Sequence, residues 1–560
     1  MENNVRVGVF FCNCNGKLAE KVDYGFIVSE VKKLPVVEYI RESQNLCAHL
    51  EGELIQKEIT KHQLNRVVVV GCAEARGEKF FTGVLKKAGL NPHHFSMVPI
   101  LEECSSVHGN GNAVTAKALE LTMMGISRAV QLDEVGFGEF AVERSVLVIG
   151  GGLAGLETAL ECADRGFKVV LLEKDEKLGG RLLRVNTIFG VAKKPADLLQ
   201  EKIKAVEGNT NIEVFTGSRL VDLDGAIGDY TAYLCKGGTE VKIKVGAIIV
   251  ATGVQTIFCP VKYGLGIADN VIGQMKLERV LADGKDFTQK RISFIVGKAT
   301  EDYNLSFIVG LKNALLLRKK FNATVNFFYT NVKVGGDNWE ALYTEARAAG
   351  VNFFKFVDNF EIAAQNGEIT INYEDPFLQG KLPGTHKISS DYIVLPEEIV
   401  PAEGTEELAK ILKLELGPGS FFGADNAHLL PEYTSRDGIY LVGGCQFPCM
   451  MSDIEISAKT VAEEILKKLY ADKVLVELTS PTVDATKCVV CLTCYRCCPH
   501  QAITVEHREE FKNLYKSAAQ MNPLACRRCG VCAAECPGKA VQLPDYTDAQ
   551  ILAQLEAMEG

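Results

Sequence analysis

The chain has 560 residues, and its 47% hydrophobic and 24% charged content is typical of a water-soluble protein with several domains. Its 61 Lys and Arg residues against 71 Asp and Glu residues give a formal net charge of −10, which argues against nucleic acid as a partner. The sequence has no run of ~18 uncharged apolar residues and no signal peptide, so we expect a cytoplasmic protein with no transmembrane segment.

Fourteen of the 19 cysteines lie near the two ends of the chain, and the other five are scattered through the middle. Nine lie between Cys488 and Cys536, and five lie within the first 104 residues. Disulfides are disfavoured in a reducing cytoplasm, so this number of cysteines indicates metal binding. We therefore expect metal centres at both ends of the chain.

Residues 1–140 alternate short apolar strands, expected at 5–11 and 66–70, with helices at 56–63 and 113–129, which predicts an α/β domain. Its cysteines follow strand ends or lie in other loops: Cys12, Cys14, Cys47, Cys72 and Cys104. Loops at strand ends are where α/β folds assemble their sites. Small buried cysteines would fit the same positions, and without a C-x-x-C pair the spacing does not decide between the two.

A strand, a glycine turn and a helix are expected at 146–160, VLVIGGGLAGLETAL. Gly150, Gly152 and Gly155 would let the backbone approach a pyrophosphate, which the helix N-terminus attracts. A second strand, 168–172, ends at Glu173, the expected place for a carboxylate that binds ribose hydroxyls. The pattern predicts a bound dinucleotide.

Two further segments indicate which dinucleotide is bound. LGGR (178–181) follows Glu173, and AIIVATG (247–253) is a buried strand with a small-residue turn. With the glycine turn, they resemble the FAD-binding half of the glutathione reductase and thioredoxin reductase class, which favours FAD over NAD. The residues expected to contact FAD are Gly150, Gly152, Leu153, Ala154, Gly155, Glu173, Lys174, Gly180, Arg181, Leu182, Ala251, Thr252, Gly253, Gly444, Asp453 and Ile454.

A second Rossmann-like domain is expected from the strand at 290–297, a helix that includes 311–320 and a strand at 324–329. Phosphate-binding glycines are missing, because Glu301 and Asp302 stand where a pyrophosphate would need open backbone. We expect no nicotinamide site in this domain.

The chain is expected to return to the flavin fold near 391–395, followed by the buried strand GIYLVGG at 438–444. Ser452 and Glu455 form an S-x-x-E capping pattern for a helix that would run through residue 469. In this fold class the positive end of that helix points at the flavin; the alternative is a well-capped surface helix.

The tail contains the run C-x2-C-x2-C-x3-C-P twice. This spacing is that of bacterial ferredoxins, in which the fourth cysteine of each run binds the other cluster. We assign Cys488, Cys491, Cys494 and Cys536 to one [4Fe-4S] cluster, and Cys526, Cys529, Cys532 and Cys498 to a second. Zinc is the structural alternative, and the two terminal prolines argue against it. Cys497 would be a spare, unligated cysteine.

The predicted fold class is a multidomain α/β protein. A Rossmann-type FAD domain like that of thioredoxin or glutathione reductase stands between an N-terminal α/β iron–sulfur domain and a C-terminal 2[4Fe-4S] ferredoxin domain. The expected boundaries are 1–140 for the N-terminal domain, 141–289 with 390–480 for the FAD domain, 290–389 for the Rossmann-like domain, 481–545 for the ferredoxin domain and 546–560 for a C-terminal helix.

This order of domains resembles the A-type iron–sulfur flavoproteins of heterodisulfide reductase and their bacterial homologues over nearly the whole chain. The segments that carry the resemblance are VGVFFCNCNGKL, ECSSVH, LGGRL, KNALLLRKKF, TSRDGIYLVGGC and SDIEIS. By resemblance, Cys14, Cys47, Cys72 and Cys104 would hold an N-terminal [4Fe-4S] cluster, with Cys12 as an alternative to Cys14.

The sequence also departs from that family. No cysteine lies at 296–310, and no ferredoxin insert is visible between 182 and 290. Where family members typically read Pro-Lys-Asp-Ile near the flavin, Pro448 is followed here by Cys449. Because a lysine beside the flavin shapes its redox electrostatics, electron bifurcation is not carried over by resemblance.

No nucleophile or acid–base constellation is visible, so no catalytic residue is assigned and the chemistry belongs to the cofactors. The leading hypothesis is an electron-transfer flavoprotein subunit of an anaerobic hetero-oligomeric redox complex. Its partners would be other subunits or a ferredoxin, and a dimer is compatible with this. The alternatives are a self-contained NAD(P)H-dependent reductase, like the small subunit of glutamate synthase, and a scaffold with a vestigial flavin.

Overall fold

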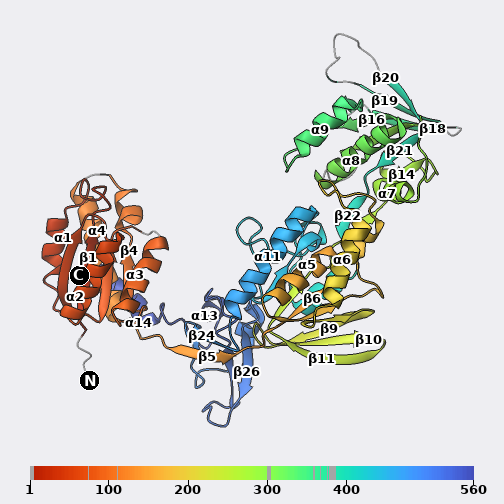
Figure 1. The fold of residues 1–560 in the computed structure, drawn as a ribbon. Coiled ribbons are helices and arrows are strands. Elements are labelled where there is room, and N and C mark those ends of the chain that lie inside the picture. Colours follow the sequence, from red (N-terminus) through yellow and green to blue (C-terminus); the bar gives the residue numbers. More distant parts are fainter. Residues whose placement is uncertain are drawn as a thin grey trace. The chain divides into compact units, whose positions relative to one another are not determined.

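The computed structural model describes residues 5–72, 75–109, 111–298, 304–356, 360–365, 368–374, 376 and 386–559. They divide into two compact units, and Figure 1 labels helices and strands of both. The first unit joins Met1–Glu139 to Leu475–Gly560, and the second is Phe140–Val474. The chain leaves the first unit within β5 (Phe137–Ala141) and returns within β24 (Lys473–Glu477). No helix in these ranges is long and apolar enough to cross a membrane.

The N-terminal part of the first unit is a parallel sheet in the order β2-β1-β3-β4. The strands are β1 (Val7–Cys12), β2 (Val37–Ser43), β3 (Arg66–Val70) and β4 (Phe95–Val98), and the helices are α1 (Tyr24–Val31), α2 (His49–Lys61), α3 (Ala75–Lys87) and α4 (Asn112–Val130). Successive side chains of a strand point to opposite faces. Phe11 therefore packs with α1 and α4, whereas Phe10 packs with α2 and α3.

The C-terminal part of the first unit carries the two cysteine runs. Each run contains one short helix, α12 (Thr493–Cys497) or α13 (Val531–Ala534), and the two helices contact each other. Two antiparallel pairs complete this part: β26 (Ile503–His507) with β27 (Ser517–Met521), and β25 (Thr482–Val483) with β28 (Val541–Gln542).

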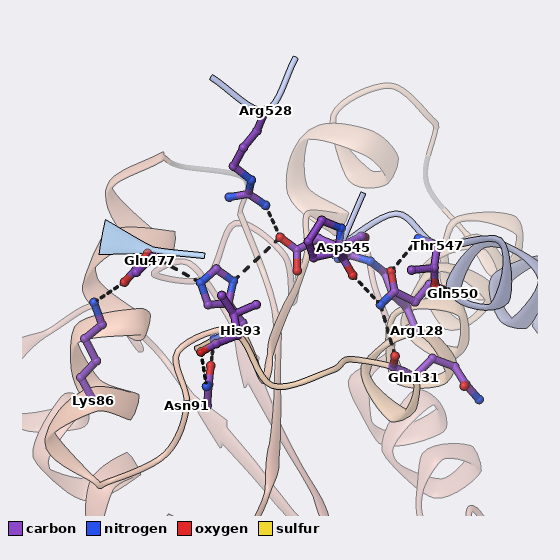
Figure 2. A network of polar contacts seen from close by, with 12 residues as sticks. Lys86, Asn91, His93, Arg128, Gln131, Glu477, Arg528, Asp545, Thr547 and Gln550 are labelled. Carbon is purple, nitrogen blue, oxygen red and sulfur yellow. Dashed lines mark hydrogen bonds and ion pairs between the residues drawn. The ribbon is translucent and has the colours of Figure 1, made fainter. Parts of the chain in front are cut away.

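The last helix, α14 (Asp548–Glu559), packs against α4 of the N-terminal domain (Figures 1 and 2). The fully buried Gln550 donates a hydrogen bond to the backbone oxygen of Gln131 at 3.2 Å. Arg128 donates to the backbone oxygen of Asp545 at 3.1 Å. The tail is therefore attached to the N-terminal domain by specific contacts, although more than 400 residues separate the partners in sequence.

The second unit begins with a parallel sheet in the order β23-β12-β6-β7-β8. Its strands are β6 (Ser145–Ile149), β7 (Lys168–Leu172), β8 (Ile212–Phe215), β12 (Ala247–Val250) and β23 (Ile439–Leu441), and its helices are α5 (Leu153–Asp164), α6 (Pro195–Glu207) and α11 (Met451–Lys468). A three-stranded antiparallel sheet joins it, made of β9 (Ser218–Asp224), β10 (Tyr230–Lys236) and β11 (Thr239–Val245).

A second parallel sheet has the order β14-β21-β15-β16-β17. Its strands are β14 (Val271–Gly273), β15 (Arg291–Val296), β16 (Thr324–Tyr329), β17 (Asn352–Lys355) and β21 (Tyr392–Leu395), and its helices are α7 (Gln274–Ala282), α8 (Asn304–Phe321) and α9 (Trp339–Ala348). Twenty described apolar residues of this sheet, its helices and their connections form one buried core, in which Phe294, Phe307 and Phe327 are fully buried.

The expectation that the chain returns to the flavin fold at 391–395 is wrong. β21 pairs in parallel with β14 and β15, so it belongs to the second sheet. The return comes at β22 (Glu398–Pro401), which pairs with β13 (Val254–Ile257). A short apolar strand is buried equally well in either sheet, so its composition alone does not reveal which sheet it joins.

Candidate cofactor sites

The parallel strands of the first sheet end along one edge, which brings together segments far apart in sequence. Ile149 pairs with Leu172 on one side and with Val250 on the other, and Val250 pairs with Leu441. The segments that follow these strand ends are 150–155, 173–182, 251–253 and 442–445, each of which the sequence assigned to FAD. We call this edge the glycine edge.

Two glycines of the turn are required by the packing of the protein itself. Gly150 has φ +114°, and a Cβ there would lie 2.5 Å from the backbone oxygen of Ala251. A Cβ on Gly155 would lie 1.7 Å from the backbone oxygen of Gly150. Neither position accepts a larger residue without moving backbone, whether or not a ligand is bound.

Gly152 differs from these two glycines. The nearest atom that a Cβ there would meet is the Cα of Gly180 at 3.9 Å, and its φ of −78° suits any residue. No protein contact in the described chain therefore requires glycine at this position. Gly152 is also the N-cap of α5, and no side chain caps the helix. The first backbone N–H groups of α5 are thus left for another acceptor, as at an anion site.

The LGGR segment lies against this turn. The Gly179 N–H donates to the backbone oxygen of Gly151 at 2.8 Å. Gly180 has φ +55°, and a Cβ on it would lie 3.0 Å from the Cα of Gly152. The backbone at Gly179 and Gly180 therefore forms one wall of the space in front of α5.

Glu173 is buried at the same edge, with 8% of its surface exposed. Its Oε2 accepts the Gly151 N–H at 2.6 Å, and its Oε1 accepts the Asp175 N–H at 2.9 Å. Each carboxylate oxygen can accept a second hydrogen bond, so Glu173 is oriented and still able to accept from a hydroxyl. The buried Thr252 Oγ1 has no hydrogen-bond partner among the described residues. The glycine edge therefore fits a dinucleotide.

The cap of α11, at one end of the glycine edge, differs from the predicted cap. α11 begins at Met451, and the Asp453 carboxylate accepts the Met450 N–H at 2.7 Å, which is the capping-box bond. Ser452 lies in the first turn, so the predicted Ser452–Glu455 cap is wrong: the helix begins two residues earlier than the S-x-x-E pattern requires. One oxygen of Asp453 is therefore occupied by the cap.

Arg181 is a partly buried cation of this region. It belongs to the short helix η2 (Gly180–Arg184), and burial lowers the pKa of its guanidinium. Burial also raises the pKa of the neighbouring Cys449 thiol to about 12, so this thiol is neutral. Sequence reasoning missed Glu397, a buried carboxylate near Arg181 that accepts the Met275 N–H at 2.8 Å. No local sequence pattern indicates this carboxylate, because the residues that bury it come from distant segments of the chain.

The remaining expected FAD residues occupy different environments. Ile454 lies beside Gly443, where a Cβ would be 3.4 Å from its Cγ1. Lys174 is half exposed and forms an ion pair with Glu403 at 3.7 Å, so its ammonium group has a partner on the surface. Gly444 lies near Gly253, and a Cβ on Gly444 would be 3.5 Å from the Gly253 Cα.

Four tail cysteines line one cavity together with apolar side chains such as Val489, Leu492 and Val505. These cysteines are Cys488, Cys491, Cys494 and Cys536, three from the first run and one from the second. Burial and the three neighbouring thiols raise the pKa of Cys494. The set is the one that the sequence assigned to one cluster.

The other four tail cysteines also lie close together: Cys498, Cys526, Cys529 and Cys532. Burial raises the pKa of the Cys532 thiol to about 12, and the other three add to this effect. Backbone N–H groups point at sulfur in both sets, from Ala502 to Cys498 at 3.4 Å and from Ala540 to Cys536 at 3.3 Å. Such hydrogen bonds tune the potential of an iron–sulfur cluster, so both sets fit [4Fe-4S].

No group of three or more His, Cys, Asp or Glu side chains within the described ranges is arranged around a single metal ion. In a cubane each thiolate binds its own iron, so the sulfurs do not converge on one point. Cys497 donates to the backbone oxygen of Cys494 at 3.5 Å and is not a member of either set of four.

Cys12, Cys14 and Cys72 come together at the ends of β1 and β3. The Sγ atoms of Cys12 and Cys14 are 3.8 Å apart, and Cys72 neighbours Cys14. The hydrogen bond from Cys14 lowers the pKa of the Cys12 thiol to about 6. The Leu46 N–H also donates to Cys12 Sγ, at 3.4 Å. Cys12, which the sequence left as an alternative, is thus part of this group.

The other two N-terminal cysteines have different surroundings. Cys47 is exposed, and its thiol donates to Asn45 Oδ1 at 2.8 Å. Cys104 is fully buried in the core under α1 and α4 and donates to the backbone oxygen of Val114 at 3.3 Å. The structure therefore brings together two of the four expected ligands, Cys14 and Cys72, with Cys12.

Within its described residues, the second sheet has no glycine turn like the one that follows β6 in the first sheet. β15 ends before Gly297, and Lys298 donates to the backbone oxygen of Phe360 while lying 4.6 Å from the centre of its ring. Glu301 and Asp302, on which the prediction of a missing nicotinamide site rests, lie outside the described residues.

Comparison with known proteins matches two family models. The pyridine nucleotide-disulphide oxidoreductase model matches residues 144–298, and the 4Fe-4S dicluster domain model matches residues 480–538. These matches confirm the predicted flavin fold and the predicted C-terminal two-cluster domain.

Similar proteins cover the chain almost completely. An A-type iron-sulfur subunit of the CoB–CoM heterodisulfide reductase from Methanopyrus kandleri is 31% identical. The gapped alignment is 670 positions long and covers 100% of this chain and 98% of the relative. The corresponding iron-sulfur subunit of the Methanocaldococcus jannaschii enzyme is 28% identical, with 99% and 98% covered. Among solved structures, T. acidophilum thioredoxin reductase matches 59% of this chain and 100% of its own, with 16% identity and a TM-score of 0.41. The chain therefore belongs to the family of A-type iron–sulfur flavoproteins of heterodisulfide reductase, and it is an oxidoreductase that combines a disulphide-oxidoreductase-type flavin domain with a 4Fe-4S dicluster domain.

Proposed function

We propose that this chain is the electron-transfer subunit of a hetero-oligomeric redox complex in the cytoplasm. It would carry one FAD at the glycine edge, two [4Fe-4S] clusters in the tail and a third at the N-terminal cysteines. The observation that supports this most strongly is the crossed grouping of the eight tail cysteines, in which each set of four takes three members from one run and one from the other.

The residues of the glycine edge would bind FAD by its polar parts. The uncapped N-terminus of α5 would bind the pyrophosphate, with Gly152 leaving room for it. Glu173 is oriented to accept from a ribose hydroxyl. When bound, FAD exchanges electron pairs and can pass the electrons on singly, which side chains alone cannot do.

The cysteines would hold the clusters that relay single electrons. Backbone N–H groups directed at Cys498 and Cys536 stabilise negative charge on sulfur, and apolar side chains line the cavity that holds Cys488 and Cys491. For the N-terminal cluster we retain Cys14, Cys47, Cys72 and Cys104 as proposed ligands. Cys12 is the alternative, and its position beside Cys14 supports it as a fifth candidate.

Partners are proposed from the relatives. Their printed names describe subunits of heterodisulfide reductases, including one that acts with H2 and ferredoxin in Methanothermobacter marburgensis. We infer that this chain also works with other subunits that bind the terminal substrate. Cys449 follows Pro448 where the family typically has lysine, so we do not assign electron bifurcation to it.

The proposal is tested on protein purified anaerobically. We expect one FAD and a reduction of the flavin by a low-potential one-electron donor or a partner subunit, with no saturable reduction by NADH or NADPH. Fast, saturable bleaching of the flavin by NADH in stopped flow would instead support the self-contained reductase. Protein that binds no FAD after anaerobic reconstitution would contradict the proposal itself.

A further inference from the structure

A buried ion pair connects two helices of the second sheet. Glu278 on α7 and Lys312 on α8 lie 2.5 Å apart, with only 1% and 12% of their side chains exposed. Glu278 Oε2 accepts the N–H groups of Asn186 at 2.8 Å and Thr187 at 3.3 Å. Lys312 donates to the backbone oxygen of Thr187 at 2.5 Å. Both charges are therefore directed at one short piece of backbone.

That piece of backbone continues from the glycine edge. Residues 186–187 follow the helix η2, which contains Gly180 and Arg181. Just before η2, the Gly179 N–H donates to the backbone oxygen of Gly151, which attaches this stretch to the glycine turn. Phe189, just beyond it, packs against the core of the second sheet. We call residues 179–189 the bridging segment, because the first sheet holds one end and the second sheet holds the other.

Stability alone is a poor explanation for this ion pair. Transferring two charges out of water is costly, and apolar residues of similar size often stabilise a protein as well or better. The cost is visible at Lys312, where burial lowers the pKa of the ammonium group in spite of the adjacent carboxylate. The pair does favour one position of residues 186–187. In that position Glu278 accepts both backbone N–H groups while Lys312 donates to the Thr187 carbonyl.

We infer that Glu278 and Lys312 are positioning residues for the flavin site. They fix residues 186–187, and the bridging segment then holds Gly179, Gly180 and Arg181 against the glycine turn. This inference rests on the proposed FAD site. It gives the second Rossmann-like domain a role that needs no nicotinamide: α7 and α8 support the wall of the flavin site from behind.

The test uses three single variants of the full-length protein. Lys312→Met and Glu278→Gln each remove one charge and leave the other buried. Lys319→Met is the matched control, because it breaks an ion pair on the same helix, Lys319 with Glu345, in which both side chains are more than half exposed. An exposed pair of this kind contributes little to stability.

The readouts are the FAD dissociation constant of the apoprotein and the midpoint potential of the bound flavin. We expect Lys312→Met and Glu278→Gln to weaken FAD binding by about tenfold or more, because residues 186–187 are released and the wall at Gly179 and Gly180 is no longer held in place. The potential should shift in both variants, because Arg181 moves relative to the flavin. Lys319→Met should match the wild type in both measurements, and all variants should keep the iron of the tail.

Wild-type affinity and potential in Lys312→Met and Glu278→Gln would overturn the inference. If either single variant failed to fold, the double variant Glu278→Gln/Lys312→Met, which leaves no unpaired charge, would decide: weakened FAD binding supports the inference and wild-type binding overturns it.

A measurement on the unaltered protein needs no variant to fold. Adding FAD to the wild-type apoprotein should slow hydrogen exchange at the amides of Asn186 and Thr187, behind the expected flavin contacts. Unchanged exchange at these amides, with FAD bound, would overturn the inference. Failure of the wild type to bind FAD at all would instead contradict the proposed function.

Discussion

Arg528, which lies between two of the expected cluster ligands, forms an ion pair with Asp545 (Figure 2). Asp545 also faces His93 of the N-terminal domain, with 3.8 Å between its Oδ2 and the ring Nδ1. The other ring nitrogen of His93 lies 3.6 Å from Glu477, which pairs with Lys86 at 2.8 Å. A continuous chain of polar contacts through His93 thus joins the loop of the second cysteine run to α3.

Asp545 is the centre of this network, so its charge should matter for the attachment of the tail. We predict that Asp545→Asn lowers the free energy of unfolding of the first unit by about 1.5–3 kcal/mol, the range for hydrogen bonds to charged groups. Thermal unfolding followed by circular dichroism measures this change. Asp548→Asn, on the exposed start of α14, is the control and should be within about 0.5 kcal/mol of wild type.

The same network predicts a dependence on pH. The bond with His93 and the charges of Arg528 and Arg128 lower the pKa of Asp545, and Lys86 and then His93 lower that of Glu477. A lowered carboxyl pKa stabilises the folded state above the ordinary value near 4, and this stabilisation is lost as the pH falls through the lowered value. The difference in melting temperature between wild type and Asp545→Asn should therefore be full at pH 7 and shrink below about pH 4. A difference that stays constant down to pH 3 would contradict the assigned role of this carboxylate.

The glycine turn of the edge could be predicted from sequence because its signals are local. A strand, a glycine turn and a helix follow one another within 146–160, and the crossed cysteine sets follow from spacing alone. Strand β7, predicted at 168–172, has those bounds in the structure. The local pattern was therefore sufficient to place the strand, the turn and the helix, and the residues that contact FAD and the clusters remain predictions.

The parts that could not be predicted depend on distant partners. β21 reads as a buried strand in either sheet, so only its pairing with β15 assigns it. His93 and Asp545 are polar residues of the kind found on any surface, and nothing in their local sequence indicates that they meet. Glu278 is similar: within an amphipathic helix it resembles a solvent-facing carboxylate, yet it is 1% exposed.

Iron content tests the N-terminal cysteines separately from the tail. We predict twelve irons per chain, four for each of three clusters, and Cys72→Ala should lose about four of them while retaining FAD. Cys497→Ala, at the spare tail cysteine, should lose none. A wild-type content of about eight irons would leave the tail assignment intact and rule out the N-terminal cluster. Cys104→Ala discriminates further, because its thiol faces Val114 in the core: loss of four irons requires that thiol to turn toward Cys14 and Cys72 when iron binds.

The glycine turn allows loss of ligand to be separated from loss of fold. A Cβ on Gly155 would lie 1.7 Å from a backbone oxygen, so Gly155→Ala should disrupt the turn itself and destabilise the second unit by several kcal/mol. A Cβ on Gly152 meets no protein atom closer than 3.9 Å, so Gly152→Ala should fold normally. In that variant the methyl group would instead stand where the backbone must approach the pyrophosphate.

We therefore expect Gly152→Ala to keep the wild-type melting temperature of the apoprotein and all of the tail iron, and to bind FAD at least about tenfold more weakly. The weakening corresponds to the loss of one hydrogen bond to a charged group, about 1.5–3 kcal/mol. Gel filtration followed by denaturation and measurement of released flavin fluorescence gives the FAD content, and calorimetry gives the stability. Stoichiometric FAD in Gly152→Ala would place the pyrophosphate elsewhere, because Gly152, which the packing of the described residues around the turn does not require to be glycine, would then have no ligand to accommodate.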